Sequence, residues 1–99
     1  MIDKKDLLLS AMRALLDNIP STLRFCKITE EPNNIIFTCV FNENANEEDI
    51  ELLRCAGTEI IANYNEHLIE EIIIINNQTK PIDIKGDLIY KINENMPKH

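Results

Sequence analysis

The sequence predicts an α+β fold with two layers, in which a four-stranded, mainly antiparallel sheet carries two helices on one face. Two segments place apolar residues at helical spacing, and each is followed by two apolar segments typical of strands, which gives the order α-β-β-α-β-β. Both helical stripes would be buried on one sheet face, so the other face is expected to be partly open. Ile36, Val40 and part of 72–75 would need cover there from the loop 76–86, the C-terminal tail or a second copy.

Composition indicates one globular domain that spans residues 1–99. Of the 99 residues, 44% are hydrophobic and 27% charged, which is typical of a chain with a packed core. The longest uninterrupted apolar run is Ile72–Ile75, far short of the roughly 20 residues that span a bilayer, so we expect a cytoplasmic protein without a membrane partner. The three cysteines form no CxxC pair, which favours reduced thiols over disulfides or a zinc site.

The first helix is predicted between Ile2 and Asn18. Asp3 and Asp6 lie near its start, where carboxylates favour the positive end of the helix dipole. Pro20 ends it, because a proline disfavours helical backbone at the residue before it. The expected buried stripe consists of Leu8, Ala11, Met12, Leu15 and Ile19.

A hairpin is predicted next, from strands at Thr22–Thr29 and Ile35–Phe41. The residues between them, Glu31 to Asn34, include a proline that presets φ and asparagines that tolerate left-handed backbone. The second strand is apolar on both faces, so we expect it in the interior of the sheet.

The second helix is predicted over Glu47–Tyr64, capped by Asn44 or Asn46, each of which has an acidic residue three positions later. Gly57 in the buried stripe predicts a close approach to the sheet. The predicted stripe consists of Ile50, Leu53, Gly57, Ile60, Ile61 and Tyr64. The opposite side is predicted to present Glu48, Glu51, Leu52, Cys55, Thr58, Glu59 and Ala62.

The last two strands are predicted at Leu68–Ile75 and Asp87–Ile92. The segment Asn76–Gly86 between them is too long for a tight hairpin and is expected to form a loop. We expect the tail Asn93–His99 to be frayed.

The negative charge of the chain is concentrated in one segment, Glu43 to Glu71. That segment carries a net charge of −8 while the whole chain carries −7, so the remaining residues sum to +1. This acidity argues against a nucleic-acid binder, which needs clustered lysine and arginine, and favours a basic protein partner.

Four kinds of catalytic or ligand site were weighed against simpler explanations. Cys39 with His67 as its base would form a nucleophilic pair, but a cysteine on an apolar strand face is more simply core packing. Glu70 and Glu71 are adjacent on a strand and point to opposite faces, so they cannot work together as acid and base. The run Glu47-Glu48-Asp49 lacks the spacing of a calcium loop, and no glycine-rich phosphate loop is present. We therefore predict no catalytic residues, no metal and no cofactor.

The outer face of the second helix is the predicted binding site. Leu52 and Cys55 would form an apolar centre with an acidic rim, the arrangement expected of an interface with a basic protein. The alternative is a solvated helix face with one stray leucine. The predicted partner-binding residues are Glu43, Glu47, Glu48, Glu51, Leu52, Cys55, Thr58 and Glu59.

Several motifs resemble a family of small bacterial cytoplasmic proteins that includes immunity proteins of contact-dependent growth inhibition and related toxin systems. They are Arg13-Ala14-Leu15-Leu16-Asp17-Asn18-Ile19-Pro20, Thr22-Leu23-Arg24, Glu47-Glu48-Asp49, Thr58-Glu59-Ile60-Ile61-Ala62 and Gly86-Asp87-Leu88-Ile89-Tyr90-Lys91. The sequence departs from the family pattern at Asn63, at Tyr64 and in its isoleucine-rich strand from Ile72.

The resemblance implies a protein that is not an enzyme and that binds and neutralises a cognate toxin domain. A nuclease toxin suits the acidic charge of this chain, because nucleases carry cationic surfaces that bind phosphate. We expect it to act as a monomer or a weak homodimer. Two other classes stay open at this point: an intracellular adaptor or regulatory module that uses the same face, and a small hydrolase or thiol enzyme.

Overall fold

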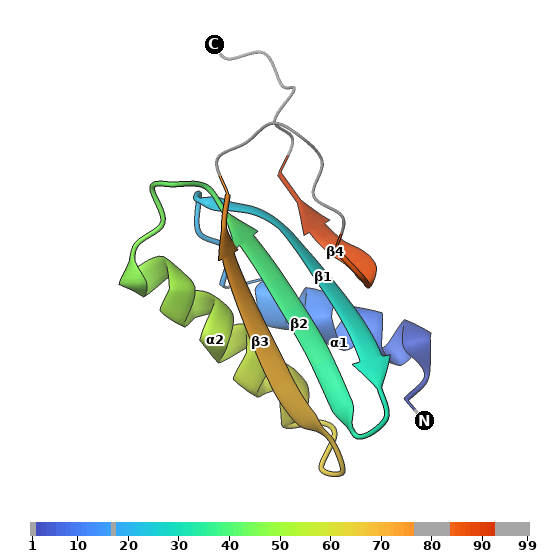
Figure 1. Ribbon diagram of the computed structural model, residues 1–99. Helices are drawn as coiled ribbons and strands as arrows, with labels where there is room; N and C mark the ends of the chain where they lie inside the picture. The colour runs from blue at the N-terminus through green and yellow to red at the C-terminus, as the bar shows by residue number, and fades with distance from the viewer. Residues whose placement is uncertain (1, 17, 77–83, 93–99) are drawn as a thin grey trace.

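A computed structural model describes residues 2–16, 18–76 and 84–92 of the chain (Figure 1). The predicted order α-β-β-α-β-β is confirmed, and Figure 1 shows both helices on the same side of the sheet. Among the described residues, no helix is long and apolar enough to cross a membrane. The elements are α1 (Lys4–Leu15), β1 (Leu23–Glu31), β2 (Asn34–Phe41), α2 (Glu47–Ile61), β3 (Leu68–Ile75) and β4 (Asp87–Lys91).

The four strands lie in the order β3-β2-β1-β4. β1 pairs antiparallel with both β2 and β4, whereas β2 and β3 run parallel, because α2 carries the chain back across the sheet between them. The sheet is therefore mixed and mostly antiparallel, as predicted. β2 is an interior strand, which explains why its sequence is apolar on both faces.

The β1–β2 hairpin turns at Pro32 and Asn33. Asn33 has φ of 65°, the left-handed conformation that the sequence predicted for an asparagine here. β1 reaches Glu31, two residues beyond the prediction, because Glu30 and Glu31 still pair with the first residues of β2. The turn is thus confined to two residues and sets the register of the hairpin.

The buried side of α1 differs from the predicted stripe. Ala11 and Leu15 are buried as expected, but Met12 and Ile19 are 43% and 40% exposed, and Leu8 is half-buried. The prediction for Met12 was wrong because α1 is apolar around more than half of its circumference, so its spacing is compatible with more than one buried stripe. The prediction for Ile19 was wrong because α1 ends at Leu15, before it reaches Ile19. The residues that α1 buries are Leu7, Ala11, Ala14 and Leu15.

α2 follows its predicted phase but ends earlier than predicted, at Ile61. The backbone N–H groups of Asn63 and Tyr64 donate to the carbonyls of Ile60 and Ile61, three residues back, so the chain leaves the helix through a tighter turn. Ala56 is buried and was not in the predicted stripe, whereas Ile50, Ile61 and Tyr64 are only partly buried. The fully enclosed part of α2 consists of Leu53, Ala56, Gly57 and Ile60.

The core lies between the helices and the helix-facing side of the sheet. Phe37, Phe41 and Ile28 are the largest side chains enclosed there together with Leu15 and Leu53. Burying such side chains stabilises the fold by about 1.5–3 kcal/mol each.

The other sheet face is partly covered. Val40 and Thr38 are buried there, whereas Ile72 and Leu88 remain exposed. The Lys27 ammonium crosses this side to donate to the carbonyl of Ile84, 3.0 Å away. Most of the predicted loop (residues 77–83) and the predicted frayed tail (residues 93–99) lie outside the described residues.

Candidate functional site

The predicted binding surface is the outer face of α2 with the loop before it, called here the acidic helix face. The structure leaves every one of its residues exposed to solvent. Five of the eight are glutamates, so the surface is strongly negative. The acidic helix face consists of Glu43, Glu47, Glu48, Glu51, Leu52, Cys55, Thr58 and Glu59.

A capping box holds the start of the acidic helix face. The Asn46 side chain accepts from the backbone N–H of Asp49 at 2.9 Å, and the Asp49 side chain accepts from the backbone N–H of Asn46 at 3.3 Å. The Thr22 hydroxyl also donates to Asp49 at 2.7 Å, which fastens α2 to the residue that precedes β1. Asp49 thus has a structural role, while Glu47 and Glu48 benefit from the helix dipole and point to solvent.

Arg54 partly offsets the negative charge of the acidic helix face. Its guanidinium lies 3.7 Å from a Glu51 carboxylate oxygen, and both side chains are exposed. Such a pair contributes at most about 1 kcal/mol to stability and remains free to exchange partners. The Thr58 hydroxyl donates to the carbonyl of Arg54 at 3.1 Å, which leaves the methyl group of Thr58 as its main contact group.

Leu52 and Leu53 differ in solvent exposure, as the helical spacing predicts. Leu53 is fully buried in the core, whereas Leu52 is 36% exposed. On the helix circumference, Leu52 lies between the buried Ala56 and the exposed Glu59, which places it on the flank of the acidic helix face. An apolar side chain is thus available beside a row of carboxylates.

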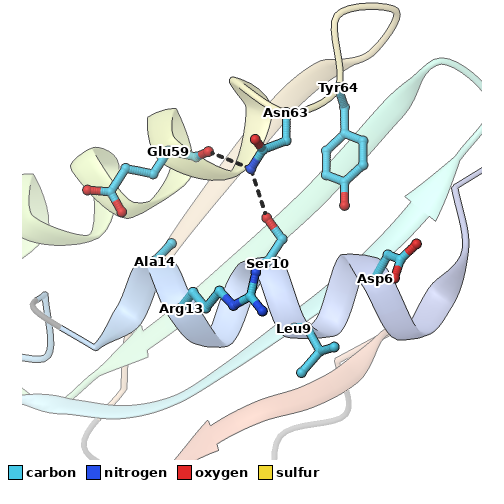
Figure 2. Close-up of a pocket in the computed structure, with 8 residues that line it drawn as sticks. All are labelled: Asp6, Leu9, Ser10, Arg13, Ala14, Glu59, Asn63 and Tyr64. Carbon is cyan, nitrogen blue, oxygen red and sulfur yellow. Dashed lines mark hydrogen bonds between the residues drawn. The ribbon is translucent and has the colours of Figure 1, made fainter.

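A groove with a volume of about 390 Å³ lies between α1 and α2 (Figure 2). Figure 2 shows Asn63, just after α2, bridging to α1: its amide donates to the Ser10 hydroxyl at 3.2 Å and to the Glu59 carbonyl at 3.4 Å. Arg13 of α1 gives the groove a positive group beside these polar ones. The residues that line the groove are Asp6, Leu9, Ser10, Arg13, Ala14, Glu59, Asn63 and Tyr64.

Sequence reasoning found only Glu59 of this groove as a binding residue. The groove forms where two helices far apart in sequence meet, and nothing in the local pattern of either helix indicates that meeting. The one feature that could have indicated the groove is Leu9, an apolar residue that is exposed. It lies opposite the buried Leu7, Ala11 and Ala14 on the helix circumference.

Glu71 lies on the helix-facing side of β3, directly beneath Gly57 of α2. One of its carboxylate oxygens, Oε2, is buried and has no hydrogen-bond partner among the described residues. Burial raises the pKa of Glu71 above its ordinary value of 4.5, while Arg54 lowers it and Glu51 raises it further. Part of the carboxyl group is still solvated, so this effect is moderate.

Cys39 and His67 do not form a nucleophile and base pair. Cys39 is fully buried in β2, and its contact with Cys26, together with burial, raises the pKa of its thiol far above the ordinary value. His67 precedes Leu68, which aligns with Asn34, five residues along β2 from Cys39 and thus roughly 16 Å away. Cys39 is core packing, as the sequence suggested.

His67 has a structural partner in Glu30. The His67 Nε2 atom lies 2.9 Å from Glu30 Oε2, and the backbone N–H of Ile2 donates to both Glu30 oxygens at 3.1 Å. The hydrogen bond from Ile2, followed by the one from His67, holds the pKa of Glu30 below its ordinary value. Glu30 therefore ties the start of the chain and the loop before β3 to the end of β1.

In the part of the chain that the structure describes, no group of three or more histidine, cysteine, aspartate or glutamate side chains could hold a metal ion.

The fold and these surfaces define a small two-layer α+β protein whose charged helix faces are open to solvent. A family model of the MafI2 immunity proteins matches residues 4–94, so the chain belongs to the MafI2 immunity protein family. Comparison with curated proteins found no match. The family confirms the toxin-immunity class that the resemblance implied, and it implies a cognate toxin as the partner.

Proposed function

We propose that this protein neutralises its cognate toxin by binding it one to one through the acidic helix face. The toxin domain is a cationic nuclease, and the protein works stoichiometrically as a monomer or a weak homodimer, without catalysis or a cofactor. The family supports the immunity role, and the charge of the acidic helix face supports a cationic partner.

The observation that carries the proposal is the exposure of the entire acidic helix face. Glu43, Glu47, Glu48, Glu51 and Glu59 are all open to solvent, and Arg54 is the single lysine or arginine between positions 43 and 71. A nuclease needs a cationic surface to hold phosphates, so an acidic protein can cover that surface. Long-range attraction would also speed the encounter, by factors of about 10 to 1,000 at low salt.

An apolar anchor beside the carboxylates supports a stable complex. Leu52 and Cys55 are exposed on the same helix as the glutamates. Charged rims set the association rate and the choice of partner, whereas buried apolar anchors contribute most of the affinity. Leu52 is the larger of the two, so it is the residue that would fill a pocket on the toxin.

The test is a pull-down of the tagged protein from its own strain, followed by titration of the recovered toxin domain. We expect a cationic domain with nuclease activity, and inhibition that is complete near one immunity protein per toxin. A partner without toxic activity would contradict the proposal and would favour an adaptor role. Full inhibition at a small fraction of one equivalent would show that the protein acts catalytically.

A further inference from the structure

β3 forms one edge of the sheet, so one side of its backbone has no neighbouring strand among residues 2–16, 18–76 and 84–92 (Figure 1). The strand is eight residues long, and it pairs with β2 over its full length without a register shift. Figure 1 shows α2 on the face of the sheet behind β3, and in the described part of the chain no strand pairs with the outer side of β3. A long, regular edge of this kind can pair with a further strand.

The hydrogen bonds to β2 identify which backbone groups of β3 are free. The N–H of Leu68 donates to Asn33 and the N–H of Asn76 donates to Phe41, so the even-numbered residues direct their backbone groups toward β2. Because this direction alternates along a strand, the odd-numbered residues direct theirs toward the open edge. The outward residues are Ile69, Glu71, Ile73 and Ile75.

The edge of β3 lacks three of the features that usually prevent strand pairing, and its protection consists of Glu70 and Glu71 alone. It contains neither lysine nor proline and shows no bulge. β4, at the opposite edge, is five residues long, ends in Lys91 and has a register shift in its pairing with β1. The edge of β4 is therefore better protected than the edge of β3, whose two glutamates disfavour only some kinds of strand.

The charges of β3 indicate what kind of strand would pair with it. Glu70 and Glu71, its only charged residues, occupy the middle of the strand. If two copies paired about that centre, their acidic side chains would come within about 4.5–8 Å of each other, which disfavours self-association. A strand with a basic residue at that position is favoured instead.

The exposed side chains of β3 extend this pattern. Leu68, Glu70 and Ile72 share the sheet face away from the helices and are all exposed, Leu68 to 73%. A matching strand would carry a lysine or arginine between two apolar residues at alternate positions. β3 also lies beside the helix that carries the acidic helix face, since Glu71 lies directly beneath Gly57 of α2.

We propose that the free edge of β3 accepts a basic strand of the toxin, which extends the sheet of the immunity protein into the complex. This inference rests on the proposed function and adds a second contact to the acidic helix face. Backbone pairing would contribute affinity, and Glu70 would select the register of the incoming strand.

Amide hydrogen exchange, measured by NMR on the free protein and on its complex with the recovered toxin domain, tests this directly. We expect the amides of Ile69, Glu71, Ile73 and Ile75 to exchange quickly in the free protein and to become protected in the complex. The even-numbered amides should be protected in both. Unchanged exchange at the odd-numbered positions in a tight complex would overturn the inference.

A proline variant gives a second, independent measurement. Ile75→Pro removes one outward N–H from an exposed position, whereas the matched control Ile75→Ala shortens the side chain and keeps the N–H. We expect Ile75→Pro to weaken toxin binding about five- to tenfold more than Ile75→Ala does, with both variants folded by circular dichroism. Equal affinities would count against strand pairing.

Failure of the strand inference can be told apart from failure of the proposed function. A toxin domain that binds tightly without protecting β3 leaves the immunity role intact and refutes the edge contact. Absence of any toxin binding refutes the proposed function. Protection of the odd-numbered amides in the free protein, together with dimers in sedimentation experiments, would identify a second copy as the occupant.

Discussion

Gly57 of α2 lies directly over the carboxylate of Glu71 in β3. A Cβ atom added to Gly57 would lie 2.8 Å from Glu71 Oε2 and 3.0 Å from its carboxyl carbon, closer than real Cβ contacts allow. The glycine that the sequence marked as a close approach thus makes room for a charged side chain. The cost is a helix interior that is about 1 kcal/mol less stable than it would be with alanine.

Gly57→Ala should therefore have an effect that depends on residue 71. With Glu71 present, the gain in helix propensity is offset by the need to displace the carboxylate, so the free energy of unfolding should change by less than about 0.5 kcal/mol. In a Glu71→Ala background the same substitution should stabilise the protein by about 1 kcal/mol. Urea unfolding of the four proteins measures this coupling. An equal gain in both backgrounds would show that the two residues are independent.

Glu71 should make the protein less stable as the pH rises. Its folded pKa is raised above the ordinary 4.5, so the folded state holds the proton more tightly than the unfolded chain, and stability falls between pH 4.5 and the folded pKa. Glu71→Gln should raise the free energy of unfolding at pH 7. The gain should not exceed about 1 kcal/mol, because the rest of the carboxylate is solvated. Thermal melts at several pH values measure the difference in stability between Glu71→Gln and the natural protein. This difference should disappear below pH 4.5. A variant that is less stable than the natural protein at pH 7 would refute this reasoning.

Glu30 should show the opposite pH dependence. Its folded pKa is lowered from 4.5, so its stabilising effect is present above that pH and is lost as the pH falls through the folded pKa. Glu30→Gln should lower the melting temperature at pH 7 and have little effect at an acidic pH below the folded pKa, where the carboxylate of the natural protein is protonated. Glu31→Gln, at the exposed neighbouring position, is the control and should change little at either pH. A loss of equal size at both pH values would indicate a packing role for Glu30.

Leu53 and Leu52 should have opposite importance for folding and binding. Leu53 is fully buried, so Leu53→Ala should cost about 2–5 kcal/mol of stability, whereas Leu52→Ala should cost less than about 1 kcal/mol. In calorimetric titration with the toxin domain, Leu52→Ala should lose about 1–3 kcal/mol of binding free energy. If Leu52→Ala unfolds as readily as Leu53→Ala, Leu52 is a core residue and the anchor must be sought on the sheet.

Reversing charges on the acidic helix face should slow association with the toxin. The double variant Glu48→Lys with Glu51→Lys should bind at least about tenfold more slowly at low salt, with a weaker dependence on salt. The pair Glu31→Lys with Glu66→Lys changes the net charge equally, at exposed positions near the hairpin turn. Stopped-flow rates for the two variants separate local from overall charge. Equal slowing by both pairs would mean that the acidic helix face has no special role.

The sequence by itself determined the features that depend on neighbouring residues. The order of helices and strands, a left-handed asparagine in the hairpin turn and a cap at Asn44 or Asn46 follow from chemistry within a few positions along the chain, and the structure selects Asn33 and Asn46. The exposure of Glu48, Glu51 and Cys55 also followed, because α2 has one well-defined apolar stripe and its opposite side must face solvent.

Tertiary structure alone decided which elements meet. The order β3-β2-β1-β4, the parallel pairing of β3 and the groove between the helices bring together residues that are far apart in sequence. It also decided that α1 buries Leu7 and Ala14 in preference to Met12. Local spacing sets the period of apolar residues within an element, but where a helix is apolar nearly all round, only the partner it packs against selects the buried side.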